Sequence, residues 1–248
     1  MMTEKMKKNL VIALVCLFAS MLLFSSCVDN DEKYLEVGLP ISTTIGTLND
    51  AGDGRLYIDS DLGNTLYVKN SEMLSSTGFE AGQRIYAEFP APMVNKTPFV
   101  GEVELLYAYA VKVKDVVALT DANREEIGDD PIDVYSIWNS KNYLNVQFHF
   151  LTNGPDPHYI NLVSVDDSQN IDGYVYLEFR HNANGNKPLK DYLGIVSFDI
   201  SEYMEDPAVK GFMIRVNSYG KEHVITVPLA NSEPEKVARG LGDASLVE

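Results

Sequence analysis

Hydrophobic and polar residues alternate along most of the chain, which is the pattern of half-buried β-strands. Two short runs, 55–58 and 65–68, flank the polar residues 59–64 and predict a hairpin. A longer alternation predicts a single strand that bends around a small barrel, with these residues on its apolar face: Val103, Leu105, Tyr107, Tyr109, Val111 and Val113. With about five strands in all, residues 41–120 predict an OB-like five-stranded barrel.

Residues 120–131 break the alternation. Thr120 is a good helix-capping residue and Gly128 a good helix end, so a short helix or turn is expected between them. The Asp129-Asp130-Pro131 sequence then returns the chain to an extended conformation, because the residue before a proline disfavours helix. We therefore expect a domain boundary in this segment.

The second half of the chain contains short strand patterns separated by turn residues. The candidates begin at Ile132, Tyr143, Tyr159, Tyr174, Leu193, Gly211 and His223. Seven such strands predict a seven-stranded Ig-like β-sandwich over residues 131–230, so the expected fold class is all-β throughout. Residues 231–248 contain few large apolar side chains and are expected to form a flexible tail.

The start of the chain has the three parts of an export signal. Lys5, Lys7 and Lys8 are basic, the run Leu10–Phe24 is apolar, and two serines precede Cys27. An apolar run of about 15 residues is short for a membrane-spanning helix but suits a secretory signal. The small residues before the cysteine resemble a bacterial lipobox, so residues 1–26 are predicted to be a lipoprotein signal peptide and Cys27 to carry the lipid. The alternative is an ordinary secretory signal with a cysteine there by chance.

The predicted anchor leaves residues 27–40 as an acylated tether. Two or three acyl chains hold a protein firmly to a bilayer, whereas one is marginal. The acidic residues after Cys27 resemble the surface-export signal of Bacteroides-type lipoproteins, or form a plain flexible tether. We expect attachment to the outer membrane and leave open whether the body faces the periplasm or the cell surface.

The charge and cysteine content narrow the possible partners. The chain has a formal charge of −16, and because the leader carries three lysines against one glutamate, the remainder carries −18. Such a body repels nucleic acid and anionic headgroups, so no nucleic-acid partner is expected. Cys16 lies in the leader and only Cys27 follows it, so an internal disulfide is excluded from the mature chain.

No catalytic constellation is apparent in the sequence. The histidines at 149, 158, 181 and 223 are not spaced as metal ligands, and neither a nucleophile motif nor a phosphate-binding loop is present. Residues 59–64 resemble a calcium loop but lack its closing glutamate, so a turn is the better interpretation. The acidic pairs 129–130 and 166–167 are interpreted as solvated loops. We therefore expect no enzyme, no catalytic residue, no metal and no cofactor.

The most distinctive polar stretch is residues 179–186. Its asparagines and glycine favour a hairpin loop, because these residues tolerate positive φ. The alternative is a binding loop, whose candidate residues are Arg180, His181, Asn182 and Asn184. Trp138 is a further candidate, since an exposed aromatic ring can stack on a sugar.

Several of these features together resemble the NigD-like lipoproteins of Bacteroides-type bacteria. They are the cysteine anchor with its acidic tail, the strand at 83–89, the alternation at 103–113 and above all the sequence at 178–185. The resemblance implies an N-terminal OB domain, a C-terminal β-sandwich and a role in bacteriocin immunity, without a set of catalytic residues. The leading hypothesis is a non-enzymatic binding protein whose partner is a bacteriocin or another envelope protein. The alternative hypothesis is a surface glycan-binding accessory lipoprotein.

Overall fold

The computed structural model describes residues 40–76, 78–92, 98–165, 171–229 and 247–248. The predicted signal peptide, Cys27 and almost all of the predicted tether and tail therefore lie outside the described residues. Among the described residues, every helix is too short or too polar to cross a bilayer.

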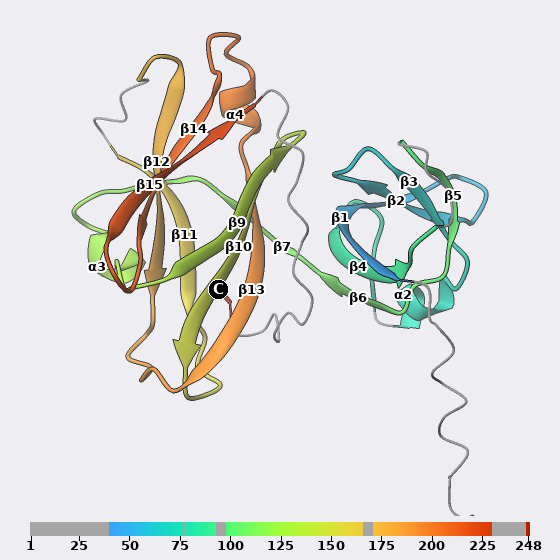
Figure 1. The fold of residues 1–248 in the computed structure, drawn as a ribbon, viewed down its shortest axis with the longest axis horizontal. Helices are drawn as coiled ribbons and strands as arrows, with labels where there is room; N and C mark the ends of the chain where they lie inside the picture. Colours follow the sequence, from blue (N-terminus) through green and yellow to red (C-terminus); the bar gives the residue numbers. More distant parts are fainter. Residues whose placement is uncertain (1–39, 77, 93–97, 166–170, 230–246) are drawn as a thin grey trace, which may run out of the picture. The chain divides into compact units, whose positions relative to one another are not determined.

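The first part of the described chain forms one six-stranded sheet with a short helix (Figure 1). Its elements are β1 (Ile41–Asp50), β2 (Leu56–Ser60), β3 (Thr65–Val68), α2 (Glu72–Ser76), β4 (Arg84–Pro90), β5 (Val100–Val103) and β6 (Tyr107–Ala110). The strand order is β5-β3-β2-β1-β4-β6. The sheet packs against an apolar core that includes Leu48, Ile58 and Ile85, and its closure into a barrel stays a prediction.

The long strand predicted over 103–113 is divided in the structure. β5 pairs in parallel with β3, β6 pairs antiparallel with β4, and the chain then leaves this sheet. Tyr107, which the alternation placed in the core, is 48% exposed, and Val113 is also exposed. The prediction was wrong here because the strand serves two different sheets, and a period-2 pattern cannot show where one sheet ends and the next begins.

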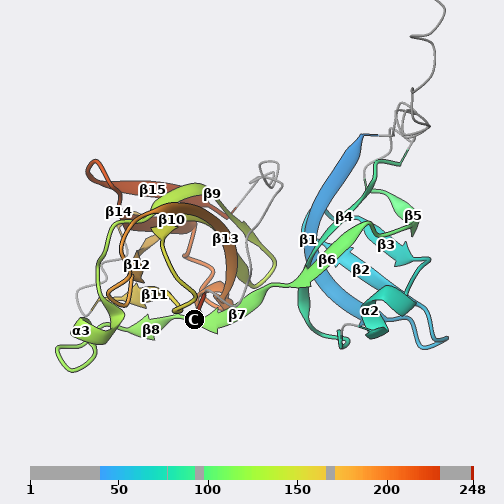
Figure 2. The ribbon, with the colours of Figure 1, turned by 90° about the horizontal axis from the view of Figure 1, so that it is seen from below.

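The second part is a pair of facing sheets with two short helices (Figure 2). Its elements are β7 (Lys112–Asp115), β8 (Val117–Ala118), α3 (Arg124–Ile127), β9 (Asp133–Ser140), β10 (Tyr143–Thr152), β11 (Tyr159–Ser164), β12 (Tyr174–Asn182), β13 (Lys190–Asp199), α4 (Ser201–Met204), β14 (Gly211–Asn217) and β15 (Glu222–Pro228). One sheet has the order β7-β13-β10-β9 and the other β15-β14-β12-β11-β8. Between them lies a core rich in phenylalanine, which includes Phe148, Phe150, Phe179, Phe198 and Phe212.

This part contains the seven strands that the sequence predicted, β9 to β15, each beginning within three residues of the expected position. The strands β7 and β8 are additional and come from before residue 120. They pair in parallel with β13 and β11, and β12 pairs in parallel with β14. The chain therefore enters the sandwich at Lys112, ahead of the boundary expected at 120–131, and the exact domain limits remain a prediction.

The segment between β8 and β9, residues 119–132, lies against the outer face of the five-stranded sheet, and we call it the covering segment. Leu119 and Ile127 are buried with Val163 of β11 in a small apolar cluster. The predicted helix or turn is present as α3, and Gly128 follows it with a φ of 70°. This segment covers the part of the sheet on which the polar residues of β12 are found.

Candidate functional site

The distinctive 178–182 sequence forms the end of strand β12, and only residues after Asn182 form a turn. Phe179 and His181 point into the core, while Glu178, Arg180 and Asn182 lie on the outer face. The prediction of a hairpin loop from Phe179 onward was wrong by four residues. The outer side chains of Glu178 and Arg180 are buried beneath the covering segment, so the strand carries charged residues at positions that solvent does not reach.

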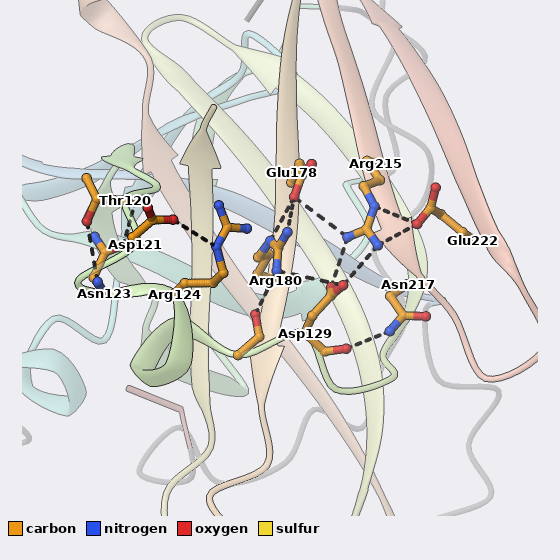
Figure 3. Close-up of polar contacts among 11 residues, drawn as sticks. Thr120, Asp121, Asn123, Arg124, Asp129, Glu178, Arg180, Arg215, Asn217 and Glu222 are labelled. Atoms are coloured by element: carbon orange, nitrogen blue, oxygen red, sulfur yellow. Dashed lines mark hydrogen bonds and ion pairs between the residues drawn. The ribbon is translucent and has the colours of Figure 1, made fainter. Parts of the chain in front are cut away.

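The outer face carries a cluster of two arginines and three carboxylates, which we call the arginine cluster (Figure 3). Its members are Asp129, Glu178, Arg180, Arg215 and Glu222. Arg215 donates from both Nη atoms to the two oxygens of Asp129, at 2.9 Å each, and from Nε to Glu222 at 2.7 Å. Arg180 donates from Nε to Glu178 at 2.7 Å. Such bidentate, charge-assisted hydrogen bonds are stronger than neutral ones.

Strand register brings the cluster together. β12 and β14 are parallel neighbours in which Glu178 is opposite Arg215, and Glu222 follows on the adjacent β15. Hydrogen bonding to Asp129 raises the pKa of Arg215, with Glu222 acting in the same direction. Both guanidinium groups thus lie between carboxylates of the protein itself.

The arginine cluster also holds the covering segment to the sheet. Arg180 donates to the carbonyl oxygen of Gly128 at 3.2 Å, and Asn182 donates to that of Glu126 at 2.7 Å. The side-chain amide of Asn217 donates from Nδ2 to the carbonyl oxygen of Asp129 at 2.6 Å. The arrangement is a structural latch: both cations are paired with the protein's own carboxylates, which outnumber them three to two, so it is not built as a site for a free anion.

A buried pair of histidines lies directly beneath the latch. Nδ1 of His158 is 2.7 Å from Nε2 of His181, and Nδ1 of His181 is 3.0 Å from the carbonyl oxygen of Pro131. A carbonyl oxygen only accepts, so His181 carries its proton on Nδ1 and His158 donates to its Nε2. Nε2 of His158 is buried and has no hydrogen-bond partner among the described residues.

The environment keeps both rings neutral. Burial, together with the neighbouring His181 and against a raising effect of Asp130, lowers the pKa of His158 to about 4. Burial also lowers the pKa of His181, against the raising effects of Pro131 and Asp130. His158 stacks on Phe150 with ring centroids 4.0 Å apart, so the pair is part of the core and out of reach of a substrate.

The predicted binding-loop residues are brought together, but mostly in structural roles. Arg180 and Asn182 hold the covering segment, His181 is buried, and Asn184 lies in the turn with a φ of 51°. A role of these residues in binding stays a prediction. Trp138 lies elsewhere, on β9, and is 2% exposed, so it is not the exposed ring that the glycan hypothesis requires.

The sequence interpretation missed Asp129, Glu178, Arg215 and Glu222. Asp129 was interpreted as part of a solvated loop, whereas it accepts hydrogen bonds from Arg215. The spacing of Glu178 and Arg180 two residues apart was an available signal, since such residues share one face of a strand. Arg215 could not be connected to them from sequence, because parallel pairing joins strands that are distant along the chain.

The acidic residues of the 59–64 segment, considered above as a calcium loop, form ion pairs within a turn. In the 59–64 turn, both carboxylate oxygens of Asp61 accept from Arg84 at 2.7 Å, and Asp59 pairs with Lys141. Among the described residues there is no group of three or more acidic, histidine or cysteine side chains arranged to hold a metal ion. The 166–167 pair lies outside the described residues.

An exposed tyrosine lies on the edge strand β9 of the sandwich. The register of β9 against β10 shifts so that Ser136 and Val134 have partners and Tyr135 between them does not. This is a β-bulge, which re-aims the side chain of the extra residue. Tyr135 is 63% exposed as a result.

Comparisons with solved structures show the same fold in several proteins. A protein of unknown function from Bacteroides vulgatus has 24% identity and a TM-score of 0.66, over 81% of this chain and 97% of that one. A NigD-like immunity protein from Bacteroides caccae has 16% identity and a TM-score of 0.55, over 82% and 98%. A candidate lipoprotein from Bacteroides fragilis has 13% identity and a TM-score of 0.62, over 78% and 100%. At these identities the likeness shows the fold alone.

Sequence comparison identifies the second domain. No curated protein matches the chain. Residues 115–229 match the NigD-like C-terminal beta sandwich domain, a range that begins at the end of β7 and ends just after β15. Residues 115–229 are therefore a NigD-like C-terminal beta sandwich domain.

Proposed function

We propose that the chain is a non-enzymatic envelope lipoprotein that binds a protein partner and gives immunity to a bacteriocin. The observation that carries this proposal is the NigD-like C-terminal domain, because a solved protein of the same fold is named as a NigD-like immunity protein. A role by binding also suits the geometry. The charged residues of the arginine cluster are paired with one another, and the histidine pair is buried, so both serve the fold.

The edge strand β9 is the surface on which we place the partner. Sheet edges bind proteins by adding a strand, with side chains next to the edge giving specificity. Tyr135 projects from this edge, and aromatic residues are enriched among the residues that dominate binding energy at interfaces. Tyr219, in the turn between β14 and β15, is also exposed, and its hydroxyl accepts from the backbone of Leu151 at 3.0 Å.

Anchoring is the second component of the proposal. A lipid on Cys27 would hold the body at the outer membrane, and the likeness to a candidate lipoprotein supports this. Incorporation of radiolabelled palmitate into the wild type and not into Cys27→Ser tests the anchor. Protease treatment of intact cells then shows whether the body is on the cell surface or faces the periplasm.

A gene-deletion experiment tests the immunity role. The deletion strain is challenged with bacteriocins of neighbouring strains, with complementation by the wild type or by Cys27→Ser. We expect deletion to increase sensitivity to at least one bacteriocin, and only the anchored form to restore resistance. Unchanged sensitivity to every bacteriocin tested would remove the immunity role.

Glycan binding is the alternative function, and it depends on Tyr135. With Trp138 buried, Tyr135 is the exposed ring on the sandwich best placed to stack on a sugar. A glycan array probed with the wild type and with Tyr135→Ala distinguishes the two functions. Glycan binding that Tyr135→Ala abolishes would favour this alternative, and an array without binding would exclude it.

A further inference from the structure

The chain contains two Asn-Gly dipeptides, Asn153-Gly154 and Asn184-Gly185. An asparagine before a glycine is prone to deamidation, because no side chain shields the backbone nitrogen of the glycine. In this reaction the glycine nitrogen forms a bond to Cγ of the asparagine and the Cγ–Nδ2 bond breaks. The proton of the glycine nitrogen leaves with the Nδ2 group as ammonia. Water then opens the five-membered imide to give aspartate or isoaspartate.

The two dipeptides lie in segments that contact each other in the sandwich. Asn153 lies in the loop between β10 and β11, and Asn184 in the turn between β12 and β13. Asn186 donates from Nδ2 to the carbonyl oxygen of Asp156 at 3.2 Å, and Asn184 donates from Nδ2 to that of Pro157 at 3.4 Å. Both Asn153 and Asn184 are exposed. Access of water therefore does not distinguish the two sites, but their backbone geometry does.

The turn holds Asn184 in a conformation that cannot react. Its φ of 51° lies in the left-handed region, where ψ is about +47°. At such a ψ, Cβ of Asn184 and the nitrogen of Gly185 lie on opposite sides of the Cα–C bond, so the nitrogen cannot reach Cγ. The amide of Asn184 donates to Oδ1 of Asn182 at 2.8 Å, and the amide of Asn186 donates to the carbonyl oxygen of Ala183 at 2.8 Å. The turn must therefore open before Asn184 can react.

Asn153 has none of these restraints. Its φ is not positive. Within the described part of the chain, neither the side chain of Asn153 nor the amide of Gly154 forms a hydrogen bond. Thr152 donates from Oγ1 to the carbonyl oxygen of Gly154 at 3.4 Å, which leaves the nitrogen of Gly154 free. The two atoms that must meet, Cγ of Asn153 and this nitrogen, can therefore approach each other by rotation about single bonds.

We propose that Asn153 is a site of spontaneous deamidation and that the fold protects Asn184, although glycine follows both residues. The product places a new carboxylate in the loop that carries Asp156, whose Oδ2 lies 3.8 Å from the position of a Cβ on Gly154. Isoaspartate also adds one carbon to the main chain of this loop. The charge and path of the loop therefore change with the age of the protein. This proposal does not depend on the immunity role.

Peptide mapping of the aged protein tests the proposal. The purified full chain is incubated at pH 8, digested with trypsin and analysed by mass spectrometry. Trypsin places Asn153 and Asn184 in separate peptides, 142–180 and 181–187. We expect at least ~10-fold more product at Asn153, because only molecules whose turn has opened can react at Asn184. In guanidinium chloride, where the turn is lost, the two rates should become similar.

Gly154→Ala is the matched variant. Its added Cβ would lie 3.6 Å from Oδ1 of Asn186, an ordinary contact, so the fold should be kept, and thermal melting checks this. Because the new methyl group shields the nitrogen, the variant should lose most of the deamidation at Asn153 and keep the slow rate at Asn184.

Three results would each overturn the proposal. The first is product at Asn184 that equals or exceeds product at Asn153 in the folded chain. The second is no product at Asn153 during a time in which the chain in guanidinium chloride reacts completely there. The third is a folded Gly154→Ala chain that deamidates at Asn153 as fast as the wild type.

Discussion

Arg215 and Asp129 form a bidentate ion pair in which each Nη atom lies 2.9 Å from one carboxylate oxygen. Arg215 belongs to β14, whereas Asp129 lies in the segment between α3 and β9. The pair therefore joins the covering segment to the outer face of the sheet, 86 residues further along the chain. This contact explains why the charged side chain of Arg215 is largely buried.

Removal of the arginine should destabilise the sandwich. Arg215→Met leaves Asp129 and Glu222 without their main cationic partner, and we expect the free energy of unfolding to fall by about 2–3 kcal/mol. Urea denaturation measures the change. Arg124→Met is the control: its pair with Asp121 is exposed and 3.8 Å long, so a change below about 0.5 kcal/mol is expected. Equal losses of unfolding free energy in the two variants would contradict a stabilising role of the arginine cluster.

The histidine pair should make stability dependent on pH. Because the pKa of His158 is lowered from 6.5 to about 4 in the folded chain, the unfolded chain takes up the proton first as the pH falls. Stability is full above pH 6.5 and decreases between pH 6.5 and about 4, by on the order of 3 kcal/mol for this histidine. The lowered pKa of His181 acts in the same direction.

Unfolding in urea at pH 7 and at pH 4.5 measures this effect. His158→Phe keeps the ring stacking on Phe150 but removes the titrating group. We expect the variant to lose about 1 kcal/mol at pH 7, where the hydrogen bond to His181 is missing. The fall in stability toward pH 4.5 should be smaller than in the wild type. The same fall in both proteins would show that other groups cause it.

Close approach at Gly128 should make this position intolerant of a side chain. Gly128 has a φ of 70°, and an added Cβ would lie 2.8 Å from Cβ of Asn182 and 3.0 Å from the carbonyl oxygen of His181. Gly185 has a φ of 73° but open space around it. We expect Gly185→Ala to cost about 1 kcal/mol from backbone strain alone, and Gly128→Ala to cost about 2–3 kcal/mol. Thermal melts of the two variants give the difference, and equal costs would contradict close packing of the covering segment.

The two aromatic residues of β9 should respond in opposite ways to truncation. Trp138→Ala removes a buried ring and should cost about 3–5 kcal/mol of stability. Tyr135→Ala removes an exposed ring and should change stability by less than about 0.5 kcal/mol. If the β9 edge binds the partner, Tyr135→Ala should weaken that binding while the protein stays folded. A normal affinity for Tyr135→Ala would move the binding surface elsewhere.

Much of the fold could be predicted because its local signals are strong. The hairpin of β2 and β3 was predicted from alternation around a polar turn, and it is present. The parallel pairing of β12 with β14, and of β7 with β13, could not be predicted. Such pairs depend on tertiary contacts between distant segments, and a strand pattern does not name its neighbour.

The candidate site was only partly predictable for a related reason. Residues 179–186 stood out because their asparagines and glycine favour a turn, although the first four of them belong to β12. The partners of these side chains come from the covering segment and from β14, which are distant along the chain. The sequence therefore suggested that Arg180 and His181 are exposed, whereas the structure buries both. The exposure considered for Trp138 was wrong for the same reason, because the residues that bury its ring, Ile45, Tyr86 and Ile195, come from distant strands.

A neutralisation assay tests the proposed function most directly. The purified chain from residue 28 onward is added in excess to deletion-strain cells together with the bacteriocin to which they are sensitive. Binding of the bacteriocin should restore growth in proportion to the added protein, and Tyr135→Ala should restore it less well. Undiminished killing at every protein concentration, and no association of the two purified proteins, would contradict immunity by binding.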